Sequence, residues 1–124
     1  MSNGDFDGFD LEESLKLFDK VIELDPRYGE GYVNKANILK NEFFVRCDLD
    51  LAMEILEMAE ELDPEFAEIF FGKAEIFCDR RFGGFDLEKA VVCLDKAIDF
   101  DHKYAWAYFL KANILCSEKF SGYD

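Results

Sequence analysis

The sequence Lys35-Ala36-Asn37-Ile38-Leu39 occurs three times in slightly different forms. It returns as Lys-Ala-Glu-Ile-Phe at 73–77 and as Lys-Ala-Asn-Ile-Leu at 111–115, 38 residues further on each time. Five more sets of residues keep this spacing: Asp10, Asp48 and Asp86; Asp25, Asp63 and Asp101; Tyr28, Phe66 and Tyr104; Tyr32, Phe70 and Tyr108; and Phe44, Phe82 and Phe120. A fixed period of this length is typical of repeat proteins. The sequence therefore predicts three copies of one unit, at about 7–44, 45–82 and 83–120.

Each unit carries two apolar stripes with the 3.6-residue spacing of an α-helix. We expect one set of helices, the B-type helices, at 11–24, 49–62 and 87–100. Each begins after an aspartate, whose carboxylate can accept the free N–H groups of a helix start. The first two end at Asp25-Pro26 and Asp63-Pro64, because the residue before a proline avoids α-helical geometry.

A second set, the A-type helices, is expected at 29–43, 67–80 and 105–119. Their inward-facing residues have the order aromatic, small, large: Tyr32, Ala36 and Leu39; Phe70, Ala74 and Phe77; and Tyr108, Ala112 and Leu115. The small residue in the middle allows a neighbouring helix to approach closely. Outside this helical region, we expect a flexible segment at 1–9 and a tail at 121–124.

The composition limits the possible partners. The 124 residues include 28 acidic and 14 basic side chains, for a net charge of −14. This charge argues against nucleic acids and anionic membranes as partners, since both attract Lys- and Arg-rich surfaces. No apolar run approaches the ~18 residues that span a bilayer. Two interpretations of the acidic surplus stay open: it keeps an aromatic-rich chain soluble, or it attracts a basic partner.

The sequence contains no recognisable catalytic or metal-binding pattern. Its one histidine, His102, falls in an expected turn, whereas nucleophilic catalysis needs a base positioned beside a serine or cysteine. The four cysteines form no C-x-x-C pair of the kind that binds zinc. We therefore predict no enzymatic activity, no metal and no cofactor. Because reduced thiols are the default in the cytosol, we expect a cytoplasmic protein.

The spacing of small and large residues resembles that of the tetratricopeptide repeat family. In that family, an A-type helix has the aromatic–small–large pattern, and the following B-type helix has two small residues seven apart before Asp-Pro. The corresponding pairs here are Ser14 and Val21, Ala52 and Ala59, and Ala90 and Ala97. The match covers about 10–119, but the unit has 38 residues instead of the family's usual 34, and the third unit has Asp101-His102 in place of Asp-Pro.

The resemblance implies an all-α fold of about six helices, built as a right-handed superhelical solenoid of antiparallel helix pairs. Solenoids bind partners on a concave wall, and in this family the A-type helices form that wall. The implied wall residues are Glu30, Val33, Asn37, Lys40, Glu68, Phe71, Glu75, Cys78, Trp106, Phe109, Asn113 and Cys116. Aromatic rings beside amides suit an extended peptide, which the rings bury and the amides hydrogen-bond. The alternative, that these rings only pack against neighbouring helices, stays open.

The implied ligand is basic or neutral and apolar. Some family members hold a peptide's C-terminal carboxylate with Lys and Arg. Asn37 and Asn113 match the asparagine of that clamp, but the places of its basic residues hold Val33, Glu68, Trp106, Phe109 and Leu110. The sequence thus predicts a non-enzymatic protein-interaction module or scaffold without a carboxylate clamp.

The order of the helices gives an alternative function. The chain opens on a B-type helix and closes on an A-type helix, so we expect Tyr108 and Leu115 at one end, and Leu15, Phe18 and Ile22 at the other, to lack a covering helix. Such ends are complementary and could dock head to tail, giving a homo-oligomer. Two alternatives stay open: the chain is a fragment of a longer array, or the bent last turn shields the open end.

Overall fold

The computed structural model describes residues 10–117, and within this range the chain forms six helices and no strands. The helices are α2 (Leu11–Leu24), α3 (Gly29–Lys40), α4 (Leu49–Leu62), α5 (Ala67–Phe77), α6 (Leu87–Phe100) and α7 (Ala105–Leu115). The prediction of an all-α fold with about six helices is confirmed for the described part. The expected flexible segment at 1–9 and the expected tail at 121–124 lie outside it.

The B-type helices α2, α4 and α6 begin and end where the sequence predicts. At their N-termini, Asp10 accepts a hydrogen bond from the Glu13 N–H (3.0 Å), Asp48 from that of Leu51 (3.0 Å), and Asp86 from those of Glu88 (3.0 Å) and Lys89 (3.1 Å). Each cap satisfies backbone donors that have no partner inside the helix. At the other end, the N–H groups of Asp25, Asp63 and Asp101 donate the last helical hydrogen bonds.

The A-type helices α3, α5 and α7 end earlier than predicted. They stop at Lys40, Phe77 and Leu115 instead of 43, 80 and 119. In the first two units a side chain offers the backbone another partner: Asn41 Oδ1 accepts the N–H of Phe43, and Asp79 Oδ1 accepts that of Arg81, each at 2.9 Å. Such local bonds compete with helix continuation. The loops 41–48 and 79–86 are therefore longer than expected.

These two loops share one backbone design. In the first, the Asp48 N–H donates to Leu39 O; in the second, the Asp86 N–H donates to Phe77 O, again at 2.9 Å. Each loop thereby folds back onto the helix end from which it starts. The hydrogen bond holds the aspartate that caps the next B-type helix close to the preceding A-type helix.

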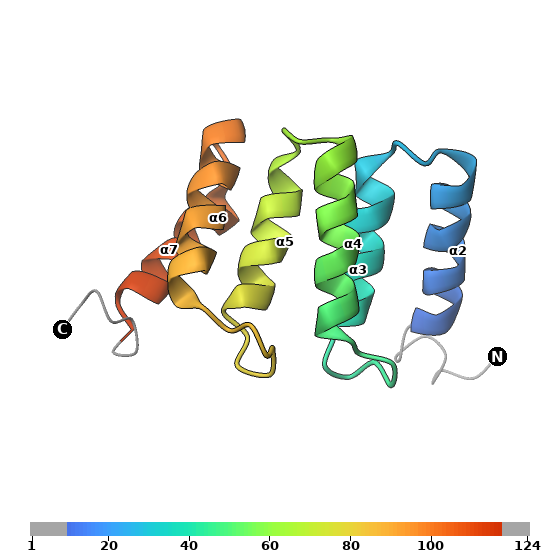
Figure 1. The fold of residues 1–124 in the computed structure, drawn as a ribbon, viewed down its shortest axis with the longest axis horizontal. Helices are drawn as coiled ribbons and strands as arrows, with labels where there is room; N and C mark the ends of the chain where they lie inside the picture. The colour runs from blue at the N-terminus through green and yellow to red at the C-terminus, as the bar shows by residue number, and fades with distance from the viewer. Residues whose placement is uncertain (1–9, 118–124) are drawn as a thin grey trace.

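The helices follow one another along the molecule in a row in chain order from α2 to α7, with α3 partly behind α4 and α7 partly behind α6 in the view of Figure 1. Their connections alternate between the two ends of the helices, with the short turns at one end and the loops 41–48 and 79–86 at the other (Figure 1). The most extensive packing joins α3 with α4 and α5 with α6. Each long loop therefore connects two tightly packed helices.

The core lies between the helices in two clusters, one centred on α2 to α4 and the other on α5 to α7. Small residues at matching repeat positions are fully buried in this core: Ala36, Ala52, Ala59, Ala74, Ala90 and Ala97. Because an alanine side chain is a single methyl group, helix axes can come close at these points. The predicted inward-facing lines of α3 and α5 are thus in the core.

The expectation for the two ends of the row is met in part on α7 and is wrong for part of α2. On α7, Tyr108 and Ala112 are exposed, as the expected lack of a covering helix requires, whereas Leu115 is half-buried. On α2, the expectation is wrong for Leu15, which is buried, and Phe18 and Ile22 are half-buried against the same core. The exposed apolar residues of α2 are instead Leu17 and Leu24.

Candidate functional site

Two adjoining grooves run between the A-type helices α3, α5 and α7. The wide groove has a volume of about 730 Å³ and lies mainly between α5 and α7. It is lined by Lys40, Glu42, Leu49, Phe71, Glu75, Ile76, Cys78, Asp79, Arg80, Arg81, Trp106, Phe109 and Leu110. The narrow groove has a volume of about 480 Å³ and is lined by Val33, Asn37, Lys40, Asn41, Glu68, Phe71, Gly72, Glu75 and Tyr104. Three residues, Lys40, Phe71 and Glu75, belong to both grooves.

The grooves bring together nine of the twelve residues that the sequence assigns to a binding wall. These are Val33, Asn37, Lys40, Glu68, Phe71, Glu75, Cys78, Trp106 and Phe109. The other three lie elsewhere. Glu30 accepts a hydrogen bond from the Tyr28 hydroxyl at 2.7 Å, Asn113 lines a separate hollow of about 220 Å³ with Cys78, and Cys116 caps the end of α7. A shared location is not evidence of binding, so the binding role stays a prediction.

The aromatic residues of the grooves differ in how much of their side chains is exposed to solvent. Trp106 and Phe109 are exposed and meet edge to face, with ring centroids 6.0 Å apart. Phe71 is half-buried because its ring packs on Tyr104 of the next unit, at 5.2 Å. Val33 is buried and can form only the floor of the narrow groove. Val33 and much of Phe71 are therefore buried by packing inside the protein, whereas the rings of Trp106 and Phe109 on α7 stay exposed.

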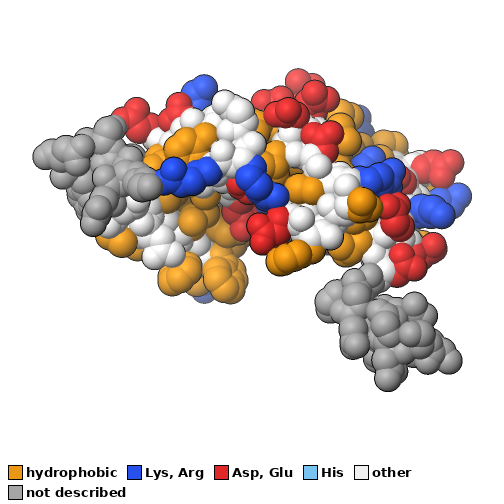
Figure 2. Space-filling model, turned by 90° about the horizontal axis from the view of Figure 1, so that it is seen from below, with side chains coloured by type: hydrophobic (Ala, Val, Ile, Leu, Met, Phe, Trp, Pro, Cys, Tyr) orange, Lys and Arg blue, Asp and Glu red, His pale blue; other side chains and the backbone are white. Residues whose placement is uncertain are grey.

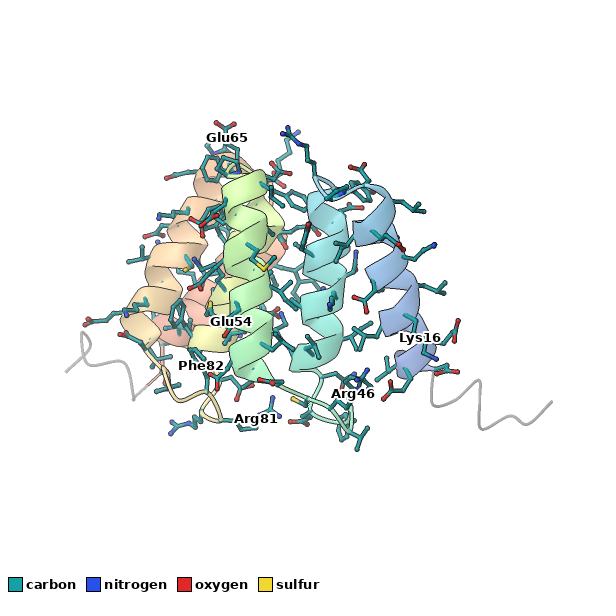
Figure 3. All side chains as sticks on the ribbon, turned by 45° about the vertical axis from the view of Figure 1, so that its right-hand side comes forward. Lys16, Arg46, Glu54, Glu65, Arg81 and Phe82 are labelled. Atoms are coloured by element: carbon teal, nitrogen blue, oxygen red, sulfur yellow. The ribbon has the colours of Figure 1, made fainter. Side chains whose placement is uncertain are left out.

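Ion pairs hold the walls of the grooves in place. Lys40 of α3 pairs with Glu75 of α5, so this bridge joins two units. Arg81 pairs with Asp79 at 2.7 Å, and this contact holds the pKa of the Asp79 carboxyl below its usual value. Arg81 also donates to Lys40 O at 3.4 Å and contacts Cys47 Sγ at 3.7 Å. Arg81 therefore ties the second loop to the first at the end of the molecule where Figure 3 labels it.

The loop end of the molecule has a mixed surface. Figure 2 views this end and shows hydrophobic side chains at the surface between acidic and basic ones. The wide groove reaches this end through Glu42, Arg80 and Arg81. Two of its cations are already occupied, since Lys40 pairs with Glu75, and Arg81 with Asp79. An anionic ligand would have to compete with these internal carboxylates.

The narrow groove is lined by two acidic residues, Glu68 and Glu75. Burial raises the pKa of the Glu68 carboxyl, and the nearby charges of Glu30 and Asp101 raise it further. Burial also raises the pKa of the Tyr104 hydroxyl, with smaller contributions from Glu68, Glu75 and Asp101. Both shifts have the sign that a surplus of negative charge produces. A cation placed beside the Phe71–Tyr104 ring pair would be favoured by these carboxylates and by the ring faces.

Sequence reasoning missed several of the groove residues. Tyr104 lines the narrow groove, and its only signal was the 38-residue spacing that it shares with Phe66 and Tyr28. Asp79 and Arg80 were hidden because the sequence favoured a helix that continues to residue 80, and Arg81 comes directly after that expected helix. Their signal is Asp79 itself, which holds the same repeat position as Asn41 and forms the same local hydrogen bond.

The four cysteines are free thiols in very different surroundings. Burial raises the pKa of the Cys93 thiol, and burial together with Glu75 and Asp79 raises that of Cys78. Because the thiolate is the reactive form, we expect iodoacetamide at mildly alkaline pH to modify exposed Cys116 first and buried Cys93 last. Mass spectrometry of timed digests measures the order. In denaturant the four rates should converge, and equal rates for Cys93 and Cys116 in the folded protein would contradict the packing of α6.

Between residues 10 and 117, no helix is long and apolar enough to cross a membrane, and no group of three or more His, Cys, Asp or Glu side chains is arranged to hold a metal ion. Comparison of the chain with protein-family models and with curated proteins found no match.

Proposed function

We propose that the row of helices is a right-handed superhelical solenoid of antiparallel helix pairs, of the tetratricopeptide repeat kind. Three observations support the proposal: the constant 38-residue spacing, the alternating connections, and the close packing of α3 on α4 and α5 on α6. The fully buried alanines at matching repeat positions, Ala36 with Ala74, Ala52 with Ala90 and Ala59 with Ala97, add to this support. In such a solenoid, α3, α5 and α7 would line the concave side.

On this basis we propose that the protein is a non-enzymatic interaction module that binds an extended peptide segment in the two grooves. The observation that carries the proposal is that adjoining grooves on three successive A-type helices combine exposed rings with amides and carboxylates. Trp106 and Phe109 would bury apolar side chains of the peptide, and Asn37 would hydrogen-bond its backbone. Elements from every unit would then contact one continuous ligand.

The charges of the grooves favour a peptide that carries Lys or Arg beside apolar residues. Glu68 lines the narrow groove, where a bound cation would offset its repulsion by the carboxylates of Glu30 and Asp101. Lys40 and Arg81 are paired internally and therefore offer little to a carboxylate ligand. We place a cationic side chain near Glu68 and Tyr104, and an apolar side chain near Trp106 and Phe109.

A random peptide display library, followed by titration of the selected synthetic peptides, tests the proposal. Trp106 is the one tryptophan in the chain, so its fluorescence reports binding in the wide groove. We expect selected peptides to be rich in basic and apolar residues. Phe109→Ala should weaken their binding by about tenfold or more, the effect expected of an aromatic anchor. Asn37→Ala should weaken it less, since one exposed hydrogen bond is lost.

Met58→Ala is the matched control, because Met58 is an exposed apolar residue on α4 and lines neither groove. It should bind the selected peptides as the wild type does. Phe109 and Asn37 are themselves exposed, so their truncation should leave the fold intact. The proposal fails if no peptide changes Trp106 fluorescence, or if all three variants bind equally well.

A further inference from the structure

Two residues of α7 are much more exposed than the residues at the same repeat positions of α3 and α5. Tyr32 of α3 is 6% exposed and Phe70 of α5 is 3% exposed, whereas Tyr108 of α7 is 49% exposed. The next position repeats the contrast, because Ala36 and Ala74 are fully buried and Ala112 is exposed. On α3 and α5 these positions belong to the same core clusters as residues of α4 and α6. This face of α7 therefore has the same pattern as the faces of α3 and α5 that are covered by a B-type helix.

The complementary contrast occurs on α2. Leu17 is 57% exposed, whereas its counterparts Ile55 of α4 and Cys93 of α6 are 6% and 8% exposed. Ile55 lies in one core cluster with Tyr32 and Ala36, and Cys93 in the other with Phe70 and Ala74. Leu17 therefore corresponds to the B-type side chains that are buried beside the faces described above. The described residues provide one A-type face and one B-type face that are both open.

Aromatic contacts between helices give a second, separate indication. Phe70 stacks on Phe100 with centroids 5.5 Å apart, and Phe71 stacks on Tyr104 at 5.2 Å. Tyr108 holds the repeat position of Phe70, and Leu24 holds that of Phe100. In the same way, Phe109 holds the repeat position of Phe71, and Tyr28 holds that of Tyr104. Tyr108, Leu24, Phe109 and Tyr28 are all exposed. The exposed apolar side chains at the two ends of the row are therefore matched in pairs.

We propose that a second copy of this chain docks on α7 with its own α2, in the way that α4 packs on α3 and α6 packs on α5. The contact would continue the internal interfaces without a change of register, burying Ala112 against α2 and placing Phe109 against Tyr28 of the second copy. It joins two different surfaces, so it is heterologous and leaves one open end on each side of the pair. The wild-type protein should therefore form a concentration-dependent series of species and not a closed symmetric dimer.

Electrostatics modulates this association. The net charge of −14 makes the copies repel one another, and salt screens that repulsion. Leu17 and Leu24 on the α2 face and Tyr108 and Ala112 on the α7 face carry no charge. Association should therefore strengthen as salt is raised. An association held together by ion pairs would weaken instead.

Two substitutions, one at each open face, test the proposal. Ala112→Arg places a long cation on the α7 face, and Leu17→Lys places one on the α2 face. Both sites are exposed, and arginine and lysine are good helix formers, so both variants should fold. Light scattering and sedimentation at high salt over a wide concentration range give the masses. We expect the wild type to exceed the 14.4 kDa monomer and each variant alone to stay monomeric.

The mixture of the two variants is the decisive measurement. Ala112→Arg keeps an intact α2 face and Leu17→Lys keeps an intact α7 face, so one copy of each should form a 1:1 dimer that does not grow. A symmetric contact through α7 alone would leave Leu17→Lys associated and would overturn the proposal. A monomeric wild type would also overturn it, and would mean that other residues, or another protein, cover α7. Neither substitution lies in the peptide grooves, so peptide binding should persist in both variants.

Discussion

Replacing Phe44 with alanine is expected to lower the free energy of unfolding by about 3–5 kcal/mol, the cost of removing a buried phenylalanine ring. Phe44 lies in a loop, yet its side chain is only 5% exposed and belongs to the core cluster around α3 and α4. Its backbone is fixed on both sides, since its N–H donates to Asn41 O and its carbonyl accepts from Cys47, each at 3.0 Å. The loop therefore cannot move inward to fill the space that the ring leaves.

Its neighbour supplies the control. Phe43 is 87% exposed, so Phe43→Ala should change stability by no more than about 0.5 kcal/mol, as is usual for surface sites. Urea denaturation followed by circular dichroism measures both variants under the same conditions. Equal effects of the two substitutions, or a loss below about 1 kcal/mol for Phe44→Ala, would mean that the loop does not anchor the helix pair.

Periodicity in the sequence identified Phe44 as part of the repeat, but it did not show that the side chain is buried in the core. Its counterpart Phe82 is half-buried and packs edge to face on Phe77, with centroids 5.9 Å apart. A loop position that keeps an aromatic ring in each unit must contact something common to the units. Here that common feature is the end of the A-type helix: Phe82 packs on Phe77, and Phe44 lies in one core cluster with Leu39, which holds the repeat position of Phe77.

The sequence predicted the B-type helices to the residue because strong local signals mark both ends. An aspartate cap begins each helix, and an Asp-Pro or Asp-His pair follows each. The A-type helices have no such stop signal. The ends of α3 and α5 are set by Asn41 and Asp79, whose side chains accept hydrogen bonds from the backbone two residues on. Those bonds compete with a helix whose apolar pattern continues past them, and the pattern alone does not reveal which prevails.

The grooves were predictable only within each helix. Spacing along one helix indicates which residues share a face, and it assigned Val33, Asn37 and Lys40 to one side of α3. It does not give the distance to the next unit. The burial of Val33 and the contact of Phe71 with Tyr104 both depend on how far α5 lies from α3 and α7. Features that arise between units therefore required the three-dimensional arrangement.

Replacing Ala74 with leucine is expected to destabilise the protein by about 3 kcal/mol, the upper part of the range for an overfilled core. Ala74 is fully buried on α5, in the core that α5 shares with α6, and these two helices have the most extensive contact in the described chain. A leucine there adds three carbon atoms between two helices whose separation is set by alanines. Ala90 and Ala97 of α6 are fully buried in the same core, so no flexible side chain can move aside at those points.

Ala112→Leu is the matched control, because Ala112 holds the same repeat position on α7 and is exposed. Leucine and alanine both favour helices, so this change should alter stability by no more than about 0.5 kcal/mol. Both variants should be unfolded with urea at low protein concentration, so that self-association does not contribute to the measured stability. If Ala74→Leu costs no more than Ala112→Leu, the small residues do not set the helix spacing. The pattern on which the tetratricopeptide resemblance rests would then have no physical basis in this chain.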